Sequence, residues 1–281
     1  MVEKIIEEIV DCMAIYGNDS TIQKIQTAHR LRLAQFWSIQ KGMRVLEIGC
    51  GQGDTTAVLA HLVGEEGLVH GIDVADVDYG SPITLGEAAR HLKASKLGAQ
   101  IKIDLATDVI ADEIDFPEQS FDVVVLSHCS WYFQSAEQLA VILKKARKWG
   151  KTLCFAEWDA RVTSIEQYPH FLAVLIQAQY ETFKDTSISN IRTLFTAEDI
   201  KKIIQQTGWE IQKENIIYSP ELQDGEWEVD FTIQDYAKEL IALDYIPEKL
   251  VQLLQTEILI LTDAIQKNAI KPMSTYILIS N

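Results

Sequence analysis

Three glycines at alternate positions, Gly49, Gly51 and Gly53, indicate chemistry more clearly than any other feature of this sequence. They follow a short apolar run typical of a buried parallel strand, and they allow the backbone to turn sharply and to approach a ligand closely. Asp54 and Thr55 then begin a helix whose first N–H groups have no partner within the helix. The turn therefore directs unsatisfied donors at a bound molecule, as a nucleotide-binding loop does.

The spacing around the turn distinguishes two kinds of nucleotide. The dinucleotide fingerprint G-x-G-x-x-G would need glycine at position 54, where this chain has Asp54, and a carboxylate beside a helix N-terminus disfavours a pyrophosphate. The segment instead resembles the first motif, E/D-x-G-x-G-x-G, of the class I S-adenosylmethionine (SAM) dependent methyltransferases, in particular the small-molecule, type 11-like members. The resemblance implies a SAM site that includes Glu47, Gly49, Gly51 and Gly53.

Further landmarks of this family follow in order. Asp73 stands 20 positions past Gly53, after an apolar strand. In the family an acid at this place accepts both ribose hydroxyls, because a carboxylate can accept two O–H groups at once. The resemblance also assigns the next residue, Val74, to the cofactor site.

The adenine contact is less narrowly defined. Asp104 and Leu105, at the end of a third predicted strand, are similar to the family's pair that contacts adenine, and Asp108 is a rival for the acid's role. A loop longer than usual follows Asp73, so the family's residue map stays open there, although Tyr79 could line the adenine pocket.

The segment after the fourth predicted strand, SHCSWYF, is expected to contact the methionine moiety or the methyl acceptor through Ser127 and His128. His128 is the predicted general base, because imidazole titrates near neutral pH. The alternative is a structural, hydrogen-bonded histidine at a strand end. No metal site is expected.

Three aromatic residues, Trp131, Tyr132 and Trp158, are predicted to line the acceptor pocket, although ordinary packing is the alternative for the first two. Trp158 lies between two acids at the end of the fifth predicted strand, which could also face the pocket. Tyr16 resembles tyrosines that close over SAM in small-molecule members of the family, with a surface or core position as its alternative.

Composition narrows the function classes. The chain has 281 residues, of which 47% are hydrophobic, enough for one core and an accessory subdomain. No run approaches the ~18 apolar residues of a membrane span, and the N-terminus is acidic, so we expect a cytoplasmic protein. The four cysteines show no C-x-x-C spacing, which indicates neither a zinc site nor a disulfide framework.

The net charge of the chain indicates which classes of partner it can bind. The formal net charge is -16, with 41 acidic residues against 25 Lys and Arg. A protein that binds nucleic acid or an anionic membrane needs a basic surface, so we expect neither as a partner. We expect a small-molecule acceptor. The oligomeric state is open, and a homodimer is possible.

The order of apolar patterns predicts the elements around this site. Helices are expected over 3–16 and 19–38, then alternating strands and helices, a long helix over 165–183, and two helices within 225–270. The fold class is α/β: a Rossmann-like, doubly wound, seven-stranded sheet, mostly parallel with the last strand antiparallel. The expected organisation is N-terminal cap helices over 1–40, a SAM-binding core over 41–160, and the remaining sheet over 161–281.

We expect segments of about 161–195 and 225–270 to join the N-terminal helices in a helical cap over the acceptor pocket; covering a sheet edge or forming a dimer face is the alternative. The predicted function is SAM-dependent methyl transfer to a small molecule. Two alternatives stay open at this point: transfer of another group, such as aminopropyl, from a related sulfonium, and a non-catalytic SAM-binding or regulatory protein.

Overall fold

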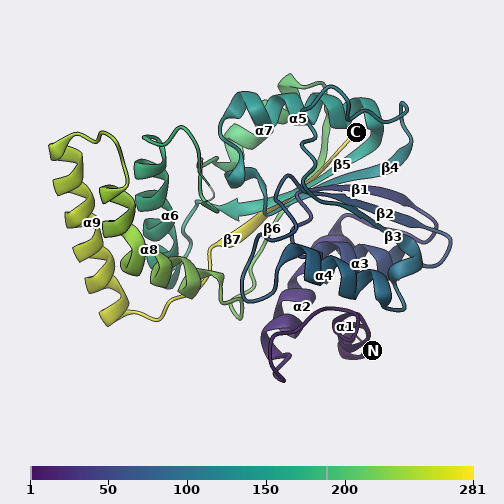
Figure 1. Cartoon of the computed structure of the whole chain (residues 1–281), viewed down its shortest axis with the longest axis horizontal. Coiled ribbons are helices and arrows are strands. Elements are labelled where there is room, and N and C mark those ends of the chain that lie inside the picture. Colours follow the sequence, from purple (N-terminus) through teal and green to yellow (C-terminus); the bar gives the residue numbers. More distant parts are fainter. Residues whose placement is uncertain (1, 188) are drawn as a thin grey trace.

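One seven-stranded sheet forms the centre of the molecule in a computed structural model that describes residues 2–187 and 189–281 (Figure 1). The strand order is β3-β2-β1-β4-β5-β7-β6. The strands are β1 (Arg44–Ile48), β2 (Leu68–Ile72), β3 (Ile101–Asp104), β4 (Phe121–Ser127), β5 (Gly150–Asp159), β6 (Ile211–Ile217) and β7 (Ser274–Ser280).

The first five strands pair in parallel, and β7 runs antiparallel between β5 and β6. The predicted fold class is therefore confirmed. From β1 the chain proceeds outward to β2 and β3, and then returns to β4 on the other side of β1. In open α/β sheets ligands bind at the carboxyl ends of the strands next to such a reversal, which here is the edge where β1 and β4 end.

Helices cover both faces of the sheet (Figure 1). Along β4, Val123 and Val125 face one core cluster while Val124 and Leu126 face the other, as expected for a strand buried on both sides. One face is covered by α1 (Val2–Val10), α2 (Thr21–Phe36), α3 (Asp54–Val63) and α4 (Leu85–Ala94), and the other by α5 (Ala136–Trp149) and α7 (Ala197–Gln206). Short 3-10 turns lie at Gly98–Gln100, Ser130–Tyr132 and Ile165–Gln167.

A third apolar cluster lies in a separate helical layer made of α6 (Tyr168–Glu181), α8 (Asp224–Ile241) and α9 (Glu248–Lys267) (Figure 1). Leu172, Val229 and Leu261 are among its buried residues. This layer contains both helices predicted within 225–270. It touches the N-terminal helices where Gln26 Nε2 on α2 donates to Asp224 Oδ2 at 2.8 Å. A cap over the acceptor pocket stays a prediction.

The N-terminal region differs from the sequence expectation. The helix predicted over 3–16 ends at Val10, and the chain turns before Gly17, whose φ is 77°. The second helix begins at Thr21 because Asp19 Oδ1 accepts hydrogen bonds from the Thr21 backbone N–H and hydroxyl. Tyr16 consequently lies in a loop and not in a helix.

None of the described helices is both long and apolar enough to span a membrane.

Candidate functional site

The glycine turn joins the end of β1 to the start of α3, as predicted. All three glycines have positive φ, namely 76° at Gly49, 52° at Gly51 and 90° at Gly53. A Cβ at Gly49 would lie 2.8 Å from Cys129 Cβ, and one at Gly53 would lie 2.9 Å from Leu92 Cδ2. A Cβ at Gly51 would meet no atom of the described chain within 4 Å. Gly51 thus borders open space, whereas the other two allow close packing.

Asp73 lies directly against this turn. Its Oδ2 accepts a hydrogen bond from the Gly51 backbone N–H at 2.8 Å, and its Oδ1 accepts one from Ala75 at 2.9 Å. Each carboxylate oxygen has a second lone pair, so both can still accept a hydroxyl. Val74, the adjoining residue, is 63% exposed. The structure thus brings the predicted ribose acid to the predicted turn.

Glu47 has a supporting position. Its side chain is buried, and its Oε2 accepts a hydrogen bond from Thr56 Oγ1 on α3 at 2.5 Å. Burial in this apolar setting raises the pKa of the carboxyl group to about 8. Glu47 therefore links β1 to α3 beneath the turn.

The two rival adenine acids have different surroundings. Asp104 Oδ2 lies 2.7 Å from His70 Nε2 and 2.6 Å from Lys102 Nζ, both on strands of the sheet. Asp108 is exposed, and its Oδ1 accepts from the Ile110 backbone N–H at 2.9 Å. Leu105 is half-buried between them in the chain. The adenine contact stays a prediction for each acid.

His128 follows β4 directly and has a φ of 51°, which is rare for a residue with a side chain. Its Nε2 lies 3.1 Å from His29 Nε2, and its Nδ1 lies 3.6 Å from Glu157 Oε1. Its ring centroid is 4.6 Å from that of Trp158. The sequence-predicted base therefore sits among a carboxylate, a second imidazole and an indole.

Glu157 is held in place by three donors. Its Oε2 accepts from the Ser130 backbone N–H at 2.8 Å and from the Ser130 hydroxyl at 2.7 Å, while its Oε1 accepts from the Trp158 N–H at 2.9 Å. These three hydrogen bonds fix the orientation of the buried carboxyl group. One of the two acids suggested for the pocket is thus directed toward His128.

His29, on α2, is the residue that sequence reasoning missed. It is 1% exposed, and burial, together with the nearby His128, lowers its pKa well below the ordinary range. Its Nδ1 lies 2.8 Å from Ser219 Oγ. The signal in the sequence was its place on the apolar stripe of α2, four residues after Ile25 and seven before Phe36.

Three buried polar atoms, one at the end of β4 and two on rings beside Trp158, have no hydrogen-bond partner among the described residues: Ser127 Oγ, His128 Nδ1 and His170 Nε2. His170 packs edge-on against the Trp158 ring, with 5.2 Å between centroids. Its Nδ1 accepts from the Met273 backbone N–H, and burial lowers its pKa to about 3, so the neutral ring carries its proton on Nε2. Unpaired polar atoms are rare in protein interiors, so these three atoms are available to water or to a polar ligand.

The other predicted pocket residues are dispersed. Trp131 is 1% exposed within the core, and its Nε1 donates to the Phe195 carbonyl at 3.3 Å, so the packing alternative stays open beside its predicted place in the pocket. Tyr132 is 38% exposed, and Tyr16 is 73% exposed in its loop. Neither is part of the histidine cluster, which His29, His128 and His170 form around Trp158, and their roles stay predictions.

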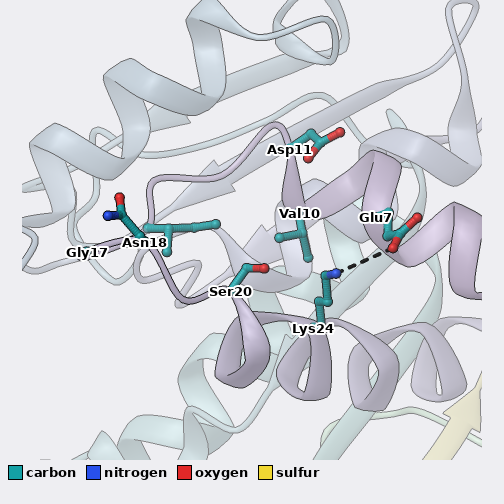
Figure 2. Close-up of a pocket in the computed structure, with 8 residues that line it drawn as sticks. Glu7, Val10, Asp11, Gly17, Asn18, Ser20 and Lys24 are labelled. Atoms are coloured by element: carbon teal, nitrogen blue, oxygen red, sulfur yellow. Dashed lines mark hydrogen bonds and ion pairs between the residues drawn. The ribbon is translucent and has the colours of Figure 1, made fainter.

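A surface pocket beside the Tyr16 loop is separate from this edge of the sheet. Figure 2 shows its lining between α1 and the start of α2, where Lys24 Nζ lies 3.4 Å from Glu7 Oε1. It includes no residue of the glycine turn or of the histidine cluster. Its lining residues are Glu7, Val10, Asp11, Ile15, Gly17, Asn18, Ser20 and Lys24.

Comparison with known proteins identifies the class. The family model described as "Methyltransferase domain" matches residues 22–214, which include the turn, Asp73 and the histidine cluster around Trp158 up to β6. The chain belongs to this methyltransferase family, and the class I fold family indicated by the motif is confirmed.

Among individual proteins, the chain is 35% identical to the cyclopropane-fatty-acyl-phospholipid synthase-like protein of Lactobacillus casei, whose crystal structure matches with a TM-score of 0.88 over 99% of both chains. It is 26% identical to methyltransferase phomM' of Diaporthe leptostromiformis over 74% of this chain. The chain spans 64% of the length of that relative. The structure of the [4+2]-cyclase SpnF, at 18% identity and a TM-score of 0.52, shares the fold alone.

Proposed function

We propose that this protein is a SAM-dependent methyltransferase that acts on a small-molecule acceptor. The observation that supports this most strongly is the contact between Asp73 and Gly51, at the edge where β1 ends. Through this contact, a carboxylate that can accept ribose hydroxyls lies next to a turn that borders open space.

The residues present fit SAM. The turn would accommodate the nucleoside, Asp73 would accept the ribose hydroxyls, and the exposed Val74 would lie beside the adenine. Ser127 Oγ is an unpaired donor at the end of β4. Arg30, whose Nε is also unpaired and whose Nη2 lies 4.0 Å from Asp54 at the start of α3, would offer a cation to the methionine carboxylate. When bound, SAM supplies a methyl group that its sulfonium has already activated.

The chain's own residues would then align an acceptor, exclude water and take up a proton. In this proposal His128 accepts the acceptor's proton and Glu157 stabilises the resulting imidazolium from 3.6 Å. Trp158 and the neutral His170 would border the acceptor.

A small-molecule acceptor is favoured by charge and by position. The net charge of -16 repels polyanions, and the histidine cluster is largely buried, which excludes a bulky duplex from the proposed methyl-transfer position. The relatives named above are called a methyltransferase and a synthase-like protein, and neither name defines the acceptor for this chain.

The second candidate function is a non-catalytic SAM-binding protein. The observation that favours it is the close packing of the buried His29 against His128, together with Trp158, at the position where an acceptor would have to sit. Aminopropyl transfer has no comparable observation in its favour.

Calorimetric titration with SAM tests the cofactor site. Asp73→Ala should weaken SAM binding by about 30- to 1000-fold, equivalent to about 2 to 4 kcal/mol, because charge-assisted hydrogen bonds to the ligand and to the turn are lost together. The matched control is Asp76→Ala, an exposed acid three residues along the same loop, which should bind SAM as the wild type does. Loss of less than threefold for Asp73→Ala would remove Asp73 from the site.

A small-molecule library monitored by release of S-adenosylhomocysteine tests catalysis. With an acceptor in hand, His128→Gln should lower kcat by about 10²- to 10⁴-fold while SAM affinity changes less than threefold. His61→Gln, on the outer part of α3, is the control. SAM binding without turnover of any acceptor would favour the non-catalytic protein.

A further inference from the structure

We infer that His29 and His128 form a single proton-binding unit, in which His29 is a positioning residue that sets the protonation of His128. The part of this inference that concerns catalysis rests on the proposed function, whereas the sharing of one proton is a property of the free protein.

The contact between the two rings requires a shared proton. The two Nε2 atoms lie 3.1 Å apart, so one must carry a hydrogen and the other must offer its lone pair. The ring planes are tilted by 50°, with centroids 5.3 Å apart. Trp158 stacks on His29 at 9° and also contacts His128, which restrains both rings.

The two ends of the pair define its polarity. At one end Glu157 Oε1 lies 3.6 Å from His128 Nδ1, and a carboxylate attracts an N–H and repels a lone pair. We therefore place the His128 proton on Nδ1, which leaves its Nε2 to accept from His29 Nε2–H. At the other end His29 Nδ1 then accepts from the Ser219 hydroxyl at 2.8 Å. Each of the other ring nitrogens then has a hydrogen-bond partner, while His128 Nδ1–H faces the Glu157 carboxylate from beyond hydrogen-bond distance.

A second proton on the pair would be strongly opposed. Two imidazolium charges about 3 Å apart in a buried setting repel each other, so the pair titrates as one base over the physiological range. The charged groups around it decide where the first positive charge resides. Arg30 and Arg32 flank His29 on α2 and disfavour a charge there, while Glu157 on β5 favours one on His128.

The remaining titratable neighbours do not oppose that arrangement. His170, on α6 beyond Trp158, is kept neutral by burial, which lowers its pKa to about 3. Burial keeps the pKa of the Cys129 thiol well above its ordinary range, so the thiol is also neutral. The charged form of the pair is thus a His128 imidazolium that faces Glu157 and donates its Nε2–H to the neutral His29.

This arrangement suits an acceptor that arrives with its proton. When the acceptor's X–H bond breaks, its electron pair would form the bond to the methyl carbon that SAM supplies, sulfur would keep the electrons of the bond it loses, and the proton would join the pair. The pair would then hold hydrogens on His128 Nδ1, His128 Nε2 and His29 Nδ1, the last directed at Ser219 Oγ. His29 favours the protonated state because the hydrogen bond that it accepts from the His128 imidazolium is charge-assisted, and is therefore stronger than the one it donates in the neutral pair.

Histidine NMR on the free protein tests the inference without any substrate. The chain has six histidines, so the ring signals can be assigned with single variants. Between about pH 5 and 8.5 the His29 and His128 signals should change with one shared apparent pKa, and together account for one proton. Separate titration of each ring near its ordinary pKa, or uptake of two protons, would overturn the inference.

Two substitutions of His29 sharpen the test. His29→Leu removes the acceptor for the His128 Nε2–H, so the apparent pKa of His128 should fall by about 1 unit. His29→Gln offers an amide oxygen in its place and should restore part of that shift, which a merely structural role would not predict. His61→Gln should leave both signals unchanged. An unaltered His128 titration in folded His29→Leu would refute the coupling.

The effect of His29 on catalysis is tested by a separate measurement of reaction rates. With an acceptor, His29→Leu should lower kcat by about tenfold or more, move the acid limb of the rate profile to lower pH, and leave SAM affinity within twofold. Loss of SAM affinity instead would assign His29 a structural role. Shared titration without any enzymatic turnover would contradict the proposed function and leave the proton-sharing pair intact.

Discussion

Gly51 and Gly49 have similar backbone conformations and opposite surroundings. At Gly51 a side chain would extend into open space, and at Gly49 it would collide with Cys129. We predict that Gly51→Val abolishes SAM binding while the protein stays folded, with a backbone penalty of about 1 to 2 kcal/mol for a side chain at positive φ.

Gly49→Ala is the matched comparison, since its Cβ would lie 2.8 Å from Cys129 Cβ. It should lower the free energy of unfolding more than Gly51→Val does, because a core contact must shift. Calorimetry and urea unfolding measure the two effects. A folded Gly51→Val protein with unchanged SAM affinity would show that the turn does not border the cofactor.

Glu47 makes stability depend on pH. Its pKa is raised from 4.5 to about 8 by burial, so between those values the folded state retains a proton that the unfolded state releases. Stability that Glu47 provides is therefore present below about pH 4.5 and is lost as pH rises toward 8, by about 1.4 kcal/mol per pH unit.

Glu47→Gln removes this titration. We expect the free energy of unfolding, measured with urea, to fall more between pH 5 and pH 8 in the wild type than in the Gln variant. Glu65→Gln, on the exposed turn after α3, should follow the wild type at both pH values. Parallel pH profiles for the wild type and Glu47→Gln would mean that the buried carboxyl is ionised throughout.

At the scale of elements, Lys184 connects α6 to α8. Its Nζ lies 2.5 Å from Glu181 Oε1 and 2.5 Å from Glu239 Oε2, and the Glu181 side chain is 1% exposed. Lys184→Met should lower the free energy of unfolding by about 2 kcal/mol or more, because it leaves a buried carboxylate without a cation. Urea unfolding measures this loss.

Lys238 provides the comparison within the same helical layer. It pairs with Asp235 at 2.6 Å, but its side chain is 77% exposed. Lys238→Met should leave the unfolding free energy nearly unchanged, since solvent screens such pairs. Equal losses in the two variants would contradict the view that the Lys184 pair holds α8 against α6.

At the scale of the whole molecule, the net charge of -16 makes the folded state repel itself. Raising NaCl from about 0.01 to 0.15 M shortens the Debye length from about 30 to 8 Å and should raise Tm. Differential scanning calorimetry without SAM measures this. A Tm that falls with added salt would mean that the ion pairs outweigh the general repulsion.

The sequence alone was sufficient for the fold class and for the glycine turn. Both depend on local patterns: an apolar strand, glycines at alternate positions and a helix start lie within 16 consecutive residues, 45–60, so their spacing specifies their geometry. The family resemblance predicted that an acid at the end of β2 lies beside the turn, and the structure places Asp73 against Gly51.

Only the tertiary structure decided which side chains meet. His29 and His128 are 99 residues apart, and their contact depends on how α2 packs beside the carboxyl end of β4 and the start of β7. Likewise, the sequence does not show that Trp131 is enclosed in the core. Nor does it show that a Cβ at Gly51 would extend into open space, whereas a Cβ at Gly49 would collide with Cys129. Periodicity assigns a residue to a face of its own element, whereas its neighbours across the sheet edge are set by long-range packing.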